Sequence, residues 1–197
     1  MDIEHALKIY KFNIEEKDID LVKFINMREY DVASKEKPLL LTCGLQSCIA
    51  LIAYEENFVF LAHMNTAGDR SSDFELNDND DAIRCLKIDD LYNEIIKNKD
   101  KIKDTISIGL VLGCMPLEKN HISRQVIEKD LLSLFEKLRN KNIPAKRIED
   151  INSMSFILDS RDGKIIHDGF ENENRVTQIT EKQKDKQSQE NESVEFC

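Results

Sequence analysis

The fold is decided by the stretch LLLTCGLQSCIALIAYEENFVFLAHM, residues 39–64, which contains the longest apolar run of the chain. Its apolar blocks at 39–41, 47–54 and 58–64 each have the length of a strand. The only polar cluster between the last two blocks is Glu-Glu-Asn at 55–57, which is typical of a hairpin turn. We therefore predict a short buried strand followed by an antiparallel hairpin.

This hairpin carries a cysteine and a histidine. Cys48 lies near the start of its first strand and His63 near the end of its second. An even-numbered turn places both side chains on one face of the sheet, and an odd-numbered turn places them on opposite faces. A cysteine is a nucleophile only as the thiolate, so a histidine within hydrogen-bond reach would serve as its base. The pair is a candidate nucleophile and base, with the turn length left open.

A purely structural interpretation of the same residues also stays open. Cysteine outside a disulfide is among the most buried residue types and usually packs as a small hydrophobe. His63, on an apolar strand, is equally compatible with a hydrogen-bonded core histidine. Cys43 is a rival nucleophile, but it ends the strand at 39–41 and has no histidine close in sequence.

Outside the hairpin, the chain alternates between helical and strand patterns. We predict a polar surface loop at 65–81, followed by a helix at 82–99 and a strand at 106–112. A second helix has Ser123 as its N-cap and ends at 142–144. A second hairpin has its strands at 156–158 and 164–166 and its turn at 160–163. We divide the chain into an N-terminal extension at 1–26, one domain at 27–170 and a polar, solvated tail at 171–197, whose few apolar residues do not repay the entropy of ordering.

The composition excludes several classes of function. A net charge of −10 argues against nucleic acid as a partner, because phosphate binding needs clustered cations. No apolar run is long enough to insert into a bilayer, and the N-terminus does not resemble a signal peptide, so we expect a cytoplasmic protein or one exported without such a signal. Five cysteines at irregular spacing, without a CxxC pair, predict neither a disulfide framework nor a metal site.

Three segments carry a resemblance to a known family. They read Met27-Arg28-Glu29-Tyr30-Asp31-Val32, Thr42-x-Gly44-Leu45-x-Ser47-Cys48-Ile49-Ala50 and Leu61-Ala62-His63-Met64. In this pattern, and over residues 27–168 as a whole, the chain resembles the CheD family of chemoreceptor glutamine deamidases. The resemblance implies the fold class α/β (α+β), a single-domain mixed β-sandwich with flanking helices that is shared with the deamidase domain of cytotoxic necrotizing factors.

The resemblance also implies a catalytic triad of Cys48, His63 and Thr42, in which Thr42 fixes the imidazole tautomer through its hydroxyl or its carbonyl. Substrate and oxyanion contacts are then expected from Gly44, Gln46, Ser47 and Asn65. No cofactor is required, and the expected partners are a protein presenting a glutamine or asparagine and a regulatory protein. The chain departs from the family at Gln46, where glycine is usual, at Cys43, where leucine is usual, and at 151–155, which replaces a glycine-rich element.

Other interpretations keep or discard this chemistry. An N-terminal asparagine amidohydrolase or an effector that deamidates a host protein would use the same nucleophile on another target. A non-catalytic binding module with the same fold would not use it at all. Selective alkylation of Cys48 distinguishes the enzymes from the module.

Overall fold

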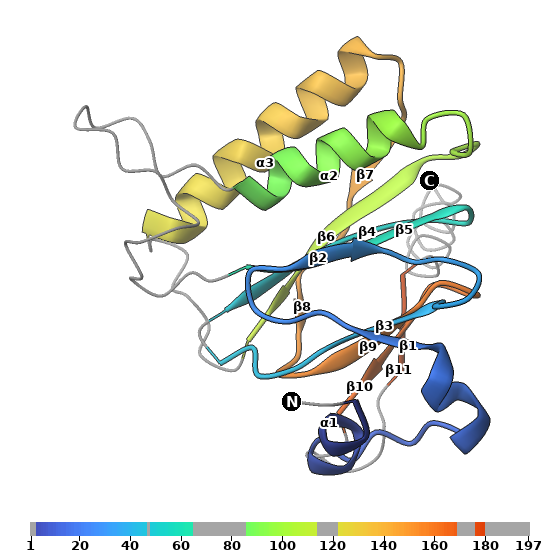
Figure 1. Ribbon diagram of the computed structural model, residues 1–197. Helices are drawn as coiled ribbons and strands as arrows, with labels where there is room; N and C mark the ends of the chain where they lie inside the picture. The colour runs from blue at the N-terminus through green and yellow to red at the C-terminus, as the bar shows by residue number, and fades with distance from the viewer. Residues whose placement is uncertain (1–2, 47, 65–85, 114–121, 169–175, 180–197) are drawn as a thin grey trace, which may run out of the picture.

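The computed structural model describes residues 3–46, 48–64, 86–113, 122–168 and 176–179, and these form two mixed sheets with helices on their outer faces (Figure 1). The helices are α1 (Ile3–Ile9), α2 (Leu86–Lys97) and α3 (Ile122–Asn140), with the 3₁₀ helix η1 (Glu16–Leu21). The first sheet runs β1 (Val22–Phe24), β3 (Leu39–Thr42), β9 (Phe156–Asp159), β10 (Lys164–His167) and β11 (Val176–Gln178). The second runs β2 (Tyr30–Val32), β5 (Phe58–Met64), β4 (Ile49–Glu55), β6 (Ile106–Leu112) and β7 (Ala145–Arg147), and β8 (Ile151–Asn152) also pairs with β6. The predicted mixed α+β fold is confirmed.

The predicted central hairpin is formed by β4 and β5. Glu55 pairs with Phe58, so the turn consists of Glu56 and Asn57. The Asn57 amide donates to the Glu55 carboxylate at 2.7 Å, which closes the turn. A two-residue turn is the even-numbered alternative, and Cys48 and His63 therefore have the same side-chain parity.

The hairpin is buried on both faces, which explains its almost continuous apolar sequence. Ile49, Leu51 and Ala53, of odd number in β4, pack beneath α2 and α3. Ala50 and Ile52, of even number, pack against the first sheet together with Leu61 of β5. Figure 1 shows the resulting layers, with α2 and α3 above the second sheet and the first sheet below it. Cys48 and His63 therefore both lie on the face between the two sheets.

Part of the segment predicted as an N-terminal extension belongs to the first sheet. Strand β1 pairs in parallel with β3, and Val22 and Ile25 are almost completely buried. Helix α1 packs through Ala6 and Leu7 on the outer face of the same sheet. Residues between 6 and 25 thus contribute to the core that the first sheet helps to form.

The predicted solvated tail is corrected at residues 176–179. Strand β11 pairs antiparallel with β10, and Ile179 is buried between the sheets. This segment, Val-Thr-Gln-Ile, has strong β-propensity and pairs with a strand edge that would otherwise stay open, which outweighs its polar surroundings.

The predicted helices are present with shifted ends. Helix α3 begins at Ile122, so Ser123 lies inside it and is not its N-cap. The loop predicted at 65–81 and the first residues of the helix predicted at 82–99 lie outside the described residues. Within the described ranges, no helix has the length and apolar character that crossing a membrane requires.

Candidate active site

The fold places Thr42, His63 and Cys48 at neighbouring positions between the two sheets. Thr42 ends β3 in the first sheet, His63 lies in β5 of the second, and Cys48 directly precedes β4. His63 pairs with Ala50, two residues beyond Cys48, so the cysteine and histidine are diagonal neighbours on the inner face of one hairpin. Diagonal neighbours remain within reach of each other's longer side chains.

The hydroxyl of Thr42 determines which nitrogen of His63 carries the proton. Thr42 Oγ1 donates to the backbone carbonyl of Ile25 at 3.0 Å, and it lies 2.8 Å from His63 Nδ1. A hydroxyl has one proton, and a carbonyl only accepts, so Thr42 accepts from Nδ1–H. The neutral imidazole therefore has its unprotonated lone pair on Nε2. Thr42 acts through its hydroxyl, one of the two routes predicted.

The environment of His63 keeps the ring neutral. Its side chain is 3% exposed, and burial lowers the pKa of His63 to about 4. Nε2 is buried and has no hydrogen-bond partner among the described residues. A buried nitrogen with an unused lone pair costs free energy unless a proton donor reaches it. The ring thus presents an available base at neutral pH.

The thiol of Cys48 is recessed beneath a methionine. The residue is 8% exposed, and its Sγ lies 4.0 Å from Met27 Sδ. Met27 is itself 49% exposed, with a flexible side chain that can adopt other rotamers. The Cys48 carbonyl accepts from the Gly113 amide at 3.3 Å, which fixes the backbone at the thiol. Access from solvent to the sulfur therefore depends on the position of Met27.

A short turn between β1 and β2 holds these groups in place. The amide of Arg28, at φ 73°, donates to the His63 carbonyl at 2.8 Å, and the His63 amide donates to the Glu29 carbonyl at 3.0 Å. The Glu29 carboxylate accepts from the amide and side chain of Asn26. This turn supplies both the Ile25 carbonyl and Met27. Sequence analysis assigned no role to these residues, and only the resemblance around 27–32 pointed to the segment.

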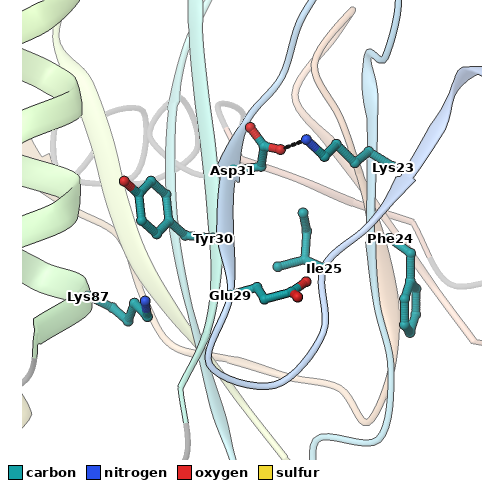
Figure 2. A pocket seen from close by; sticks show the side chains of 7 residues that line it. All are labelled: Lys23, Phe24, Ile25, Glu29, Tyr30, Asp31 and Lys87. Carbon is teal, nitrogen blue, oxygen red and sulfur yellow. Dashed lines mark ion pairs between the residues drawn. The ribbon is translucent and has the colours of Figure 1, made fainter. Parts of the chain in front are cut away.

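A hollow of about 370 Å³ lies on the other side of the same turn. Figure 2 shows it between the edge strands of the two sheets, lined by Lys23, Phe24, Ile25, Glu29, Tyr30, Asp31 and Lys87. Lys23 and Asp31 form an ion pair across it, and Asp31 also accepts from the amide of Val32 at 2.7 Å. The Asp31 carboxylate therefore uses an outward-facing amide of β2, which protects this sheet edge against pairing with another strand.

Cys43 has a different environment from Cys48. Burial raises the pKa of Cys43 to about 12, and its thiol bonds to the hydroxyl of Ser155. The amide of Gly44, at φ 76°, donates to Ser155 Oγ at 3.1 Å. A thiol with this pKa is protonated at neutral pH, as is typical of a cysteine in a protein core.

The residues predicted to contact the oxyanion or the substrate are Gly44, Gln46, Ser47 and Asn65, and the structure describes two of them. The amide of Gly44 is already used by Ser155 and is not available to an oxyanion. Gln46 is exposed, beside the recessed thiol in sequence, whereas Ser47 and Asn65 lie outside the described residues. Within the described ranges, no cluster of three metal-ligating side chains occurs.

Fold and site together define a two-sheet α+β protein with a Cys-His-Thr cluster between its sheets. Compared with known proteins, the chain matches no family model and no curated protein sequence. The interpretation of the site therefore depends on its own geometry.

Proposed function

We propose that the protein is a cysteine-dependent amidohydrolase that deamidates a glutamine or asparagine side chain of a protein substrate. The observation that carries the proposal is the hydrogen-bond chain from His63 Nδ1 through Thr42 to the Ile25 carbonyl. It leaves Nε2 unprotonated on the face shared with Cys48. The resemblance of residues 27–64 to a deamidase family supports the same chemistry.

The reaction would follow the usual sequence for a thiol acyl transfer. His63 Nε2 takes the proton of Cys48, and the thiolate attacks the carboxamide carbon to form a tetrahedral oxyanion. The oxyanion collapses, the C–N bond breaks, and His63 returns the proton to the departing ammonia. Water, deprotonated by His63, then hydrolyses the thioester and leaves a carboxylate. Neither an oxidant nor a metal takes part in this balance.

The recessed thiol favours a side chain of a larger molecule as substrate. To reach Cys48, a carboxamide must enter alongside Met27. The thioether is apolar and can pack against the methylene groups that precede the carboxamide. We expect a slender carboxamide side chain to enter there more readily than the branched backbone on either side of a peptide bond. This distinguishes a deamidase from a protease.

Mass spectrometry of candidate protein substrates, incubated in H₂¹⁸O, tests the proposal. Hydrolysis through a thioester replaces nitrogen with solvent oxygen, so the modified residue gains about three mass units instead of about one. The gain should disappear with Cys48→Ala and remain with the matched control Cys43→Ala. An equal mass gain with Cys48→Ala contradicts the proposal. So does the absence of any mass gain with the wild-type protein while its Cys48 reacts rapidly with iodoacetamide.

The same measurement separates the alternatives. Modification at an internal residue indicates a side-chain deamidase, including one that acts on a host protein. Modification confined to an N-terminal asparagine indicates an N-terminal amidohydrolase. A module that only binds produces no mass change, and its Cys48 shows no enhanced alkylation.

A further inference from the structure

A second hollow lies between α3 and β7, away from the candidate active site. It has a volume of about 500 Å³ and is lined by Phe135, Arg139, Asn142, Ile143, Pro144 and Ala145. Figure 1 shows α3 passing over the six-stranded sheet, of which β7 is the last strand. The hollow, called here the α3–β7 groove, is therefore bounded by a helix on one side and a sheet edge on the other.

The segment that forms the groove is rich in cations, in an otherwise acidic protein, and one of them, Arg139, lines the groove. Residues 135–147 contain five lysines and arginines and one glutamate, whereas the chain as a whole has a net charge of −10. Lys137 pairs with Asp89, and Arg147 pairs with two carboxylates. Arg139 and Lys141 have no ion pair among the described residues. Lys146 has none either, but its side chain lies on the opposite face of β7 from Ala145, because side chains alternate along a strand. These charges favour an anionic ligand.

The backbone of β7 has hydrogen-bonding groups directed away from its neighbour. A parallel strand bonds to its neighbour through alternate residues. The Ile106 amide donates to the Pro144 carbonyl, and the Ile148 amide donates to the Ile108 carbonyl. The even-numbered residues thus face β6. The amides and carbonyls of Ala145 and Arg147 point to the outer edge, where no described strand pairs with them.

An exposed apolar side chain extends the groove along α3. Leu132 is 67% exposed, although it is a large hydrophobe. It lies three and seven residues before Phe135 and Arg139, so the three share one stripe of the helix. An apolar stripe, a sheet edge and unpaired cations together match the way extended peptides bind between a helix and an edge strand.

We propose that the α3–β7 groove binds an extended, acidic segment of a partner protein, which adds as a strand to the outer edge of β7. On the face towards α3, side chains of that segment are apolar where they meet Phe135 and Leu132 and acidic where they meet Arg139 and Lys141. The partner is defined by this chemistry, an extended segment that combines carboxylates with apolar side chains.

This groove and the candidate active site lie at opposite ends of β6. Strand β7 pairs with the first three residues of β6, Ile106 to Ile108. At the other end, Gly113 directly follows β6, and its amide donates to the Cys48 carbonyl. Binding at the groove does not require the thiol. The inference therefore stands apart from the proposed amidohydrolase activity, and Cys48→Ala should bind the same segments as the wild type.

Selection from a display library of random 12-residue peptides, against the full chain, tests the proposal. Enriched peptides should combine acidic with β-branched or aromatic residues. In fluorescence anisotropy with those peptides, the double variant Arg139→Glu/Lys141→Glu should weaken binding at least tenfold, while Lys129→Glu, a charge reversal elsewhere on α3, should change it less than twofold. Ala145→Pro removes an outward amide that β6 does not use and should also weaken binding at least tenfold, with thermal unfolding as the control for folding.

Several outcomes would overturn the proposal. The first is that no acidic peptides are enriched, and the second is that enriched peptides bind the charge-reversal variant as well as the wild type. A third is that a peptide of residues 188–197 competes with the same variant dependence, since the occupant would then be the chain's own C-terminal segment. A fourth is concentration-dependent dimerisation in sedimentation that Arg139→Glu abolishes, which would identify a second copy as the occupant.

Discussion

Two cysteines, five residues apart and equally buried, lie in regions of opposite chemical character. Cys43 and Cys48 are each 8% exposed. Cys43 bonds to Ser155 in the core beneath α1, with its pKa raised by burial to about 12, whereas Cys48 shares a sheet face with an unprotonated imidazole nitrogen. Gly44, at φ 76°, lies where the chain turns away from β3 between them. Burial alone therefore does not define a nucleophile, and the neighbouring base does.

The largest difference between these regions should be their rate of alkylation. With a pKa of about 12, Cys43 has about 10³ times less thiolate at pH 7 than an ordinary thiol, and it should react with iodoacetamide correspondingly slowly. Cys48 should exceed that rate by at least the same factor. Peptide mass spectrometry after timed labelling measures both sites in one sample.

His63→Ala provides the control for this comparison. It should slow the labelling of Cys48 and leave that of Cys43 unchanged, because only Cys48 depends on the imidazole. Comparable rates at the two thiols in the wild-type protein would remove the distinction on which the site is built.

The next largest effect concerns the protonation of His63. Its pKa is about 4 in the folded protein and about 6.5 in the unfolded chain, so below pH 6.5 the unfolded state binds the additional proton. The contribution of His63 to the free energy of unfolding is therefore fully present above pH 6.5. It decreases as the pH falls towards 4, by about 3 kcal/mol in total. Urea unfolding at several pH values should show a shallower dependence for His63→Gln than for the wild type.

In the proposed reaction, the acidic limb of kcat/KM should likewise lie well below pH 6.5. An inflection near 6.5 in both measurements would mean that His63 titrates as if exposed to water.

A smaller effect is expected at the residue that orients the imidazole. Thr42→Val removes the hydroxyl and leaves the Ile25 carbonyl and His63 Nδ1–H without their shared partner. If the loss of these hydrogen bonds removes about 2 kcal/mol from the stabilisation of the transition state, kcat/KM falls about 30-fold. Thr42→Ser keeps the hydroxyl and should retain most of the activity. Equal activity of the two variants would show that Thr42 acts through packing alone.

The hairpin could be predicted from sequence because its signals are local. Apolar blocks of strand length and one polar cluster at 55–57 determine both strands and the turn. The face shared by Cys48 and His63 could not be chosen, because it depends on whether the turn has two or three residues. That length is determined in the structure by Glu55, whose carboxylate binds the Asn57 amide.

Other parts of the site have no local signature. The partner of Thr42 is the Ile25 carbonyl, and every residue has a carbonyl, so its identity does not appear in the sequence pattern. Residues 22–25 join the sheet only through the parallel pairing of β1 with β3, a contact between distant segments. Strand β11 depends in the same way on the open edge of β10. Such elements are determined by tertiary pairing, which overrides local composition.

The smallest effect should come from Ser155, on the Cys43 side of Gly44. Ser155→Ala removes the acceptor of the Gly44 amide and should lower the free energy of unfolding by about 1 kcal/mol in urea titration. Leu45 N–H still bonds to the Met154 carbonyl, and Gly113 N–H to the Cys48 carbonyl, so the backbone between Gly44 and the thiol keeps two anchors. We therefore expect kcat/KM to change less than about threefold. A loss of kcat/KM as large as that of Thr42→Val would contradict this expectation. It would mean that a change at Cys43 and Ser155 alters the active site through Gly44, so that the two cysteine regions are coupled.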